Sequence, residues 1–199
     1  MNISLDDIIY HPTSRQTQPN KIMKGCVLPF LKENKVKNIL DFGCGRYLRD
    51  SLLLSSNGFK VDAVDLKEQI ERIDEEKAKS INRLSAGIPS KDYDAILLNF
   101  VIQTLPTKEQ RRKVLKTAYD RLKKGYYFIL SVRDSSNMKR YAGPTRIKFN
   151  DGFIINKNSP YLFVRGYKKK EVTGILSSLD LKIIKMYDTG TSYIAISKK

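Results

Sequence analysis

The chain has 199 residues, of which 41% are hydrophobic and 29% charged, and 37 Lys and Arg against 21 Asp and Glu give a net charge of +16. This composition predicts one globular domain with its own hydrophobic core, and it excludes disordered, fibrous and disulfide-stapled proteins. The two cysteines, Cys26 and Cys44, and the single histidine also exclude a Cys/His zinc site, so no metal is expected.

Strand-like and helix-like segments alternate through the first half of the chain. An apolar run at 36–42 predicts a strand, and its end at Gly43-Cys44-Gly45 predicts a tight turn. The segments that follow predict a helix at 48–56, a strand at 60–65, a charged helix at 67–79 and a short strand at 82–85. This alternation is typical of βαβ units and a parallel sheet.

The second half continues the alternation and ends differently. Its segments predict a buried strand at 93–99, a helix at 107–124 capped by Thr107 and ended by Gly125, a strand at 126–132 and a helix at 168–178. Two last strands, 181–187 and 192–197, are joined by a connection that only an antiparallel hairpin allows. The predicted fold class is α/β: a Rossmann-like, doubly wound, mostly parallel sheet closed by a C-terminal antiparallel hairpin.

We expect residues 1–199 to form a single domain with two additions. The N-terminal segment 1–35 is predicted to be helical. Residues 133–167 leave the regular alternation and are expected to form an insertion at the substrate side of the sheet, with a hairpin around Asp151-Gly152.

Two strand ends carry residues suited to a nucleotide-like cofactor. Ligands of open α/β sheets bind beyond the carboxyl ends of the strands. Gly43 and Gly45 stand where the backbone turns sharply and comes close to a ligand, just before a helix. Asp65 ends the next strand, where a carboxylate accepts hydrogen bonds from ribose hydroxyls. A tight βα turn with a capping Asp65 is the alternative.

The glycine pattern also separates cofactor classes. A dinucleotide site needs a third glycine where this chain has Leu48, so NAD is disfavoured. The string Leu40-Asp41-Phe42-Gly43-Cys44-Gly45 instead resembles motif I of the class I S-adenosylmethionine-dependent methyltransferases. That resemblance implies S-adenosylmethionine as the cofactor, and the residues expected to bind it are Asp41, Gly43, Cys44, Gly45, Asp65, Leu66, Asn99 and Phe100.

A narrower likeness involves further strings. These are His11-Pro12-Thr13-Ser14-Arg15, Leu98-Asn99-Phe100-Val101-Ile102-Gln103, Glu109-Gln110-Arg111 and Asp151-Gly152 ahead of Phe163. Together with the glycine turn they resemble the methyltransferases associated with DNA phosphorothioation gene clusters. This chain departs from them at Gln103, where they carry Asn, and at Phe163-Val164-Arg165, where they carry a Phe-Gln-Lys-like string.

The acceptor side is predicted from a few polar and basic residues. Asn99 and His11 are the candidate catalytic residues. Asn99 followed by Phe100 is able to hold an amine and stack on a base. His11 is a candidate through its place in the His-Pro-Thr-Ser-Arg string, and a surface or capping role is its alternative. Arg15, Arg46 and Arg165 are the candidate substrate-binding residues, since guanidinium groups bind carboxylates and phosphates.

The net charge points to the partner. A strongly basic surface attracts polyanions, so nucleic acid is the expected acceptor. A Lys-rich composition without functional meaning, a small-molecule methyltransferase, and a non-catalytic accessory protein that binds S-adenosylmethionine or nucleic acid are the alternatives. With no apolar segment long enough to span a membrane and no signal peptide, we expect a cytoplasmic protein without membrane association.

Overall fold

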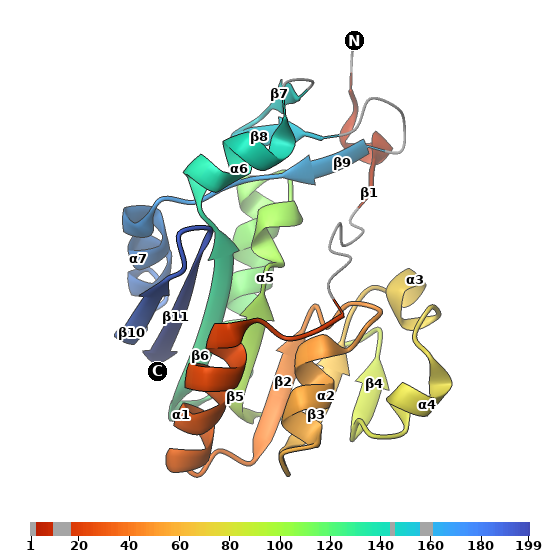
Figure 1. Cartoon of the computed structure of the whole chain (residues 1–199), viewed down its shortest axis with the longest axis vertical. Coiled ribbons are helices and arrows are strands. Elements are labelled where there is room, and N and C mark those ends of the chain that lie inside the picture. Colours follow the sequence, from red (N-terminus) through yellow and green to blue (C-terminus); the bar gives the residue numbers. More distant parts are fainter. Residues whose placement is uncertain (1–2, 10–16, 144–145, 156–160) are drawn as a thin grey trace.

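The computed structural model describes residues 3–9, 17–143, 146–155 and 161–199, which form a layered α/β fold with a smaller sheet at one end (Figure 1). Within these residues the main sheet has seven strands in the order β10-β11-β6-β5-β2-β3-β4. The strands are β2 (Asn38–Phe42), β3 (Lys60–Val64), β4 (Arg83–Ser85), β5 (Tyr93–Asn99), β6 (Leu122–Arg133), β10 (Lys182–Asp188) and β11 (Ser192–Lys198).

The pairing of these strands confirms the predicted fold class. β2 is parallel to β3 and β5, β4 is parallel to β3, and β6 is parallel to β5. β11 runs antiparallel to both β6 and β10, so the C-terminal hairpin closes the sheet. All seven residues of β5 are buried, because helices cover both faces of the sheet at its centre.

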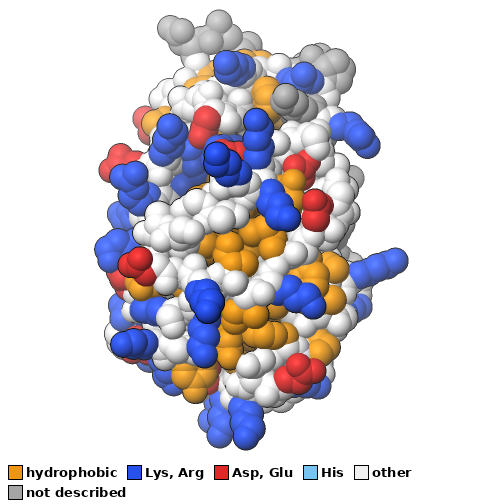
Figure 2. Space-filling view, turned by 90° about the vertical axis from the view of Figure 1, so that its left-hand side faces the viewer, with side chains coloured by type: hydrophobic (Ala, Val, Ile, Leu, Met, Phe, Trp, Pro, Cys, Tyr) orange, Lys and Arg blue, Asp and Glu red, His pale blue; other side chains and the backbone are white. Residues whose placement is uncertain are grey.

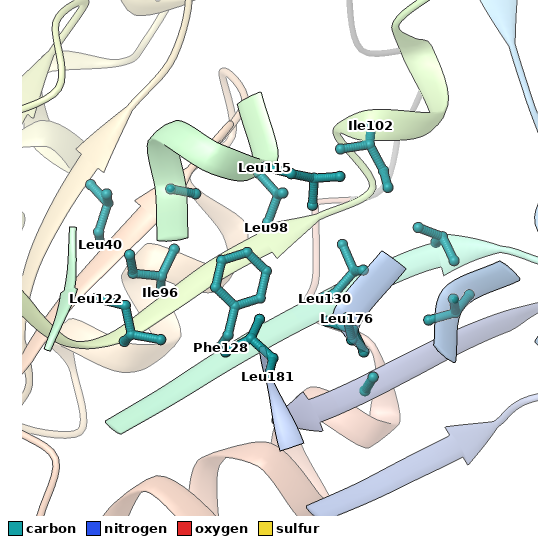
Figure 3. Close-up of a cluster of buried hydrophobic side chains, with 14 of the residues drawn as sticks. Leu40, Ile96, Leu98, Ile102, Leu115, Leu122, Phe128, Leu130, Leu176 and Leu181 are labelled. Carbon is teal, nitrogen blue, oxygen red and sulfur yellow. The ribbon is translucent and has the colours of Figure 1, made fainter. Parts of the chain in front are cut away.

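Each face of the sheet has its own hydrophobic core. On one face α5 (Lys108–Asp120) and α7 (Lys169–Ser177) bury Leu115 and Leu176 against Ile96 and Phe128 (Figure 3). On the other face η2 (Met23–Val27), α1 (Leu28–Glu33) and α2 (Arg49–Ser55) pack on β2 and β3. The short helices α3 (Lys67–Ile70) and α4 (Glu75–Ala78) lie beside β4.

The end of α5 differs from the sequence prediction. The helix begins at the Thr107 cap, which forms the expected capping box with Gln110, but it ends at Asp120 rather than at Gly125. Gly125 lies inside β6 with φ +83°, and its backbone N–H donates to the carbonyl of Lys199 at 2.8 Å. Leu122 pairs with the first residue of β5. Pairing with the sheet therefore ends the helix earlier than the local sequence pattern predicts.

The smaller sheet has the order β1-β9-β8-β7. Its strands are β1 (Ile8–Ile9), β7 (Ile147–Phe149), β8 (Gly152–Ile154) and β9 (Tyr161–Val164), and with α6 (Ser135–Ala142) they form what we call the cap. The cap stands at the carboxyl end of the main sheet (Figure 1) and has its own apolar cluster. The N-terminal segment is therefore not wholly helical, since η1 (Leu5–Asp7) leads into β1, a cap strand.

The hairpin of the cap turns one residue earlier than the sequence suggests. Phe149 pairs with Gly152, so Asn150 and Asp151 form the turn and Gly152 belongs to β8. A Cβ on Gly152 would lie 2.4 Å from the Phe163 ring. Glycine is therefore required at this position by close packing against β9.

Candidate functional site

A cavity of about 820 Å³ lies at the carboxyl ends of the parallel strands, where open α/β sheets bind ligands. Its wall is formed by the turn after β2, the ends of β3 and β6, the residues after β5, part of α5, the connection between β10 and β11, and the segment just before η2. Residues that mark successive parts of this wall are Asp65, Gly45, Phe100, Arg133 and Thr191.

The turn after β2 exposes bare backbone to this cavity. Gly43 and Gly45 have φ of +83° and +66°, which L side chains rarely adopt. The backbone N–H groups of Gly43 and Cys44 donate to the carbonyl of Val64 at 2.7 and 3.2 Å, which ties the turn to β3. A Cβ on Gly45 would meet nothing within 4 Å, so a ligand has room to lie against this glycine.

Asp65 bridges the glycine turn and the end of β3. Its Oδ2 accepts the backbone N–H of Gly45 at 2.6 Å and its Oδ1 accepts the N–H of Leu66 at 2.8 Å. Leu66 is 43% exposed and offers apolar surface at the rim of the cavity. A carboxylate beside bare glycine backbone and an apolar side chain are the groups that a nucleoside with ribose hydroxyls needs.

Phe100 follows β5 in an unusual backbone conformation. Its φ of +62° is uncommon for a residue with a bulky side chain, and its backbone N–H donates to the carbonyl of Ser131 at 2.8 Å. Strained residues of this kind concentrate at ligand sites, where surrounding structure holds them. Phe100 lines the cavity between the glycine turn and the end of β6.

Asn99 does not have the side-chain role that the sequence suggests. It lines the cavity, but its Nδ2 donates to Asp50 at 3.0 Å and its Oδ1 accepts Ser131 Oγ at 2.6 Å. Asp50 also pairs with Arg49 at 3.1 Å. The amide of Asn99 therefore joins α2 to β5 and β6 inside the protein rather than holding an acceptor amine.

Asp41 also lies behind the cavity rather than on its wall. It is buried, and its Oδ2 accepts the hydroxyl of Ser51 at 2.5 Å. Burial and the charge of Asp50 raise the pKa of Asp41 from 3.8 to about 7. Asp41 therefore supports the turn from inside the protein, and its buried position does not allow direct contact with the cofactor.

We expect Asp41→Asn to flatten the dependence of stability on pH. Unfolded Asp41 loses its proton near pH 3.8 and the folded form keeps it to about pH 7, so the wild type loses stability as pH rises through this window. The variant has no such proton and should gain stability relative to wild type at pH above 7. Urea unfolding across this pH range measures the effect, with exposed Asp92→Asn as control. An equal loss in Asp41→Asn and wild type would contradict the assignment.

Cys44 lines the cavity as a neutral thiol. Burial and the nearby carboxylates Asp41 and Asp65 raise the pKa of the Cys44 thiol well above its usual range. A thiol that keeps its proton is a poor nucleophile. Cys44 is thus suited to contact a ligand and not to attack one.

The three arginines and the histidine expected on the substrate side differ in where they lie. Arg46 is exposed on the cavity wall, where its Nη2 donates to the hydroxyl of Tyr47 at 2.7 Å. Arg165 is not on the wall, because it is held in a polar cluster that joins the cap to the core. His11 and Arg15 lie outside the described residues.

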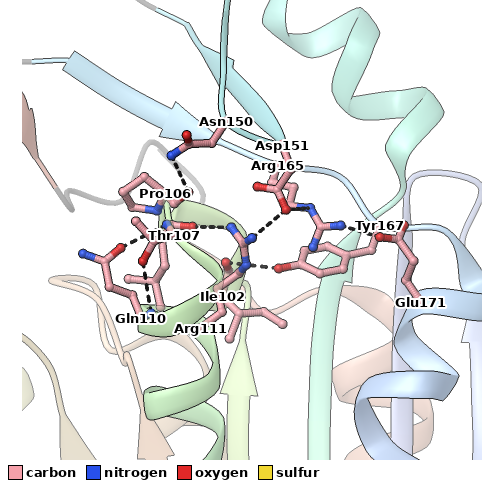
Figure 4. Close-up of polar contacts among 11 residues, drawn as sticks. Ile102, Pro106, Thr107, Gln110, Arg111, Asn150, Asp151, Arg165, Tyr167 and Glu171 are labelled. Carbon is pink, nitrogen blue, oxygen red and sulfur yellow. Dashed lines mark hydrogen bonds and ion pairs between the residues drawn. The ribbon is translucent and has the colours of Figure 1, made fainter. Parts of the chain in front are cut away.

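This polar cluster surrounds Asp151 in the turn of the cap hairpin (Figure 4). Asp151 pairs with Arg111 of α5 at 2.6 Å and with Arg165 at 3.1 Å, and Arg165 also pairs with Glu171 of α7. The backbone N–H of Arg165 donates to the carbonyl of Gln103 in η3 (Ile102–Thr104) at 2.8 Å. The backbone of Arg165 therefore positions η3, which lines the cavity, while its side chain is held by Asp151 and Glu171.

Arg133 and Thr191 are among the cavity residues that the sequence analysis missed. Arg133 ends β6 and Thr191 lies in the hairpin connection between β10 and β11. Both residues lie at the edge of the sheet where the parallel strands end. A search of every strand end at this edge could have found them. Among the described residues, no group of three or more His, Cys, Asp and Glu could hold a metal ion.

Comparison with known proteins places the chain in a family. The family model described as "Methyltransferase domain" matches residues 16–160. The chain belongs to this family, and it is an S-adenosylmethionine-dependent methyltransferase. No curated protein matches the sequence.

Several solved structures share the fold. A protein from Pyrococcus horikoshii has a TM-score of 0.72 at 20% identity, over 95% of this chain and 94% of its own. An S-adenosylmethionine-dependent methyltransferase from Methanosarcina mazei has a TM-score of 0.69 at 18% identity, over 86% of this chain and 97% of its own. The 1,6-didemethyltoxoflavin N1-methyltransferase of Burkholderia thailandensis, solved with its substrate and S-adenosylhomocysteine, has a TM-score of 0.65 at 15% identity, over 90% of this chain and 78% of its own.

The cofactor is S-adenosylmethionine, as the sequence predicted. The cavity fits it, since bare backbone at Gly45 and the carboxylate of Asp65 lie together on one wall. In the part of the chain that the structure describes, no helix is long and apolar enough to cross a membrane.

Proposed function

We propose that the chain methylates a small organic molecule that lies in the same cavity as the cofactor. The observation that carries this proposal is the extent of the cavity, which continues past Asp65 and the glycine turn to Phe100, Arg133 and Thr191. Small-molecule sites are concave and range from about 300 to 1,000 Å³, so about 820 Å³ suits a cofactor and a compact acceptor together.

Nucleic acid, the acceptor that the net charge favoured, has less support at the site. Of the arginines expected to bind it, Arg46 lies on the cavity wall, whereas Arg165 is committed to the cluster around Asp151. Figure 2 shows the face of the molecule that carries α7 and β10, where Lys and Arg side chains surround apolar surface at the centre and some of them lie next to one another. The link to phosphorothioation gene clusters stays a prediction.

The proposed work of the chain is positioning. When bound, S-adenosylmethionine supplies its sulfonium methyl, to which an acceptor lone pair bonds while the electron pair of the carbon–sulfur bond passes to sulfur. Gly45 and Asp65 would hold the methionine and ribose parts, and Leu66 and Phe100 would shield the cofactor from water. Holding two reactants in line supplies much of the acceleration of such a displacement.

The acceptor is one that needs little help with proton removal. Among the cavity residues that the structure describes, Asp65 is the one carboxylate and no histidine occurs. Asp65 is already hydrogen-bonded to two backbone N–H groups. An amine, or an oxygen or nitrogen that is acidic in itself, fits this environment.

The test follows labelled methyl groups. The protein is incubated with S-adenosylmethionine labelled in its methyl group and a cell extract that ultrafiltration has divided into small molecules and macromolecules. We expect label in the small-molecule fraction. Label confined to the macromolecular fraction and released by nuclease would instead establish a nucleic-acid acceptor. Binding of S-adenosylhomocysteine without transfer to either fraction would favour a non-catalytic accessory protein.

A further inference from the structure

The charged residues of the cavity wall are strongly unbalanced. The basic residues on the wall are Lys21, Arg46, Arg49, Lys113 and Arg133, whereas Asp65 is the one acidic residue among those described. Arg49 is paired with Asp50 at 3.1 Å, so the imbalance comes from the other basic residues. S-adenosylmethionine adds a further positive charge, because its sulfonium and ammonium groups outnumber its carboxylate. Like charges in a partly enclosed site repel one another, so an anionic acceptor would complete the balance.

Arg133 lies on the opposite side of the cavity from Asp65, the carboxylate that is expected to bind the ribose. It ends β6, and Asp65 follows β3, with β5 and β2 between these two strands. Three strand spacings separate the two positions by about 14 Å. Arg46 and Arg49 line the cavity in the segment that follows the glycine turn after β2.

The backbone of Arg133 is held on both sides. Its N–H donates to the side-chain oxygen of Gln103 at 2.9 Å, and its carbonyl accepts the N–H of Tyr167 at 2.9 Å. The guanidinium carbon lies 5.8 Å from the centre of the Phe100 ring. A guanidinium that a rigid strand end presents over an aromatic ring is organised to bind a planar anion.

We propose that the acceptor is a small organic anion whose carboxylate or phosphate binds Arg133 and whose planar part lies near Phe100. This inference rests on the proposed function and adds the chemical class of its substrate. Arg133 is then a residue that determines acceptor specificity, since a bidentate pair with carboxylate or phosphate fixes both the position and the orientation of the acceptor. The hydroxyls of Thr189 and Thr191 line the same end of the cavity.

Calorimetry with three probes tests this proposal on the protein saturated with S-adenosylhomocysteine. The probes are 4-hydroxybenzoate, phenyl phosphate and the neutral 4-hydroxybenzamide. We expect the better of the two anions to bind at least about tenfold more tightly than the amide. Arg133→Gln should abolish this preference and leave the affinity for S-adenosylhomocysteine unchanged, and Arg133→Lys should retain part of it.

Arg112→Gln is the matched control, because Arg112 is exposed on α5 and is not part of the cavity wall. It should keep the preference for anions. Equal binding of anions and amide, or no binding of any probe at millimolar concentration, would overturn the inference. Tight binding of the amide alone would overturn it while leaving a small-molecule acceptor in place. Salt-sensitive binding of a single-stranded oligonucleotide, with no binding of the small probes, would overturn both proposals.

Discussion

Asp65→Ala is expected to weaken S-adenosylmethionine binding by roughly ten- to a hundredfold, or about 1–3 kcal/mol. The carboxylate loses its contact with the ribose, and the backbone N–H of Gly45 loses a partner at 2.6 Å, which loosens the turn that faces the cofactor. Titration calorimetry with S-adenosylmethionine measures the loss. Asp65→Asn keeps one oxygen acceptor and should fall between the alanine variant and wild type.

The control for this prediction is Asp92→Asn, at an exposed position outside the cavity. It removes the same charge and should bind like wild type. Equal affinity in Asp65→Ala and wild type would mean that the carboxylate only caps the turn, which is the alternative that the sequence left open.

Gly43→Ala is expected to lower the free energy of unfolding by about 3 kcal/mol. A Cβ at this position would lie 2.2 Å from Cγ2 of Val101, and the φ of +83° is unfavourable for any L side chain. Chemical denaturation measures the change. Adding Val101→Ala to the variant removes the clash and should restore part of the stability.

Gly45→Ala is the matched comparison in the same turn. Its Cβ would meet nothing within 4 Å, so only the backbone cost of about 1 kcal/mol applies. Its added methyl group points at space that the cofactor needs, so this variant should lose cofactor affinity more than stability. Equal destabilisation by the two substitutions would show that the contact with Val101 relaxes at no cost.

Gly43 and Gly45 show what the local sequence predicts and what it does not. Both were expected to let the backbone turn and approach a ligand, and their positive φ angles agree with the turn. The crowding of Gly43 comes from Val101, which follows a strand more than fifty residues later in the chain. No local pattern announces a contact of that kind, so the sequence assigned one role to two glycines whose surroundings differ.

The sequence predicted those parts of the candidate site that depend only on where a strand ends and how the backbone turns after it. Gly45, Asp65, Leu66 and Phe100 all lie on the cavity wall, because apolar strands and the glycines after them determine where the carboxyl edge of the sheet falls. Asn99 occupies the expected position, but its partner Asp50 lies 49 residues away and takes its amide into the core.

The sequence by itself determined the order of strands and helices, the glycine turn with its following acid, and the closing hairpin, because apolar periodicity and turn residues are local signals. The sequence also predicted the insertion and its hairpin, but the tertiary structure alone decided that β1 joins the cap and which partners the charged residues take. β1 pairs with β9, whose residue Tyr161 is far along the chain from Ile8, and Arg165 is drawn to Asp151 by the meeting of separate elements. Both pairings depend on how the whole chain packs. A polar group that becomes buried forms its hydrogen bonds with the polar groups that the same packing brings beside it.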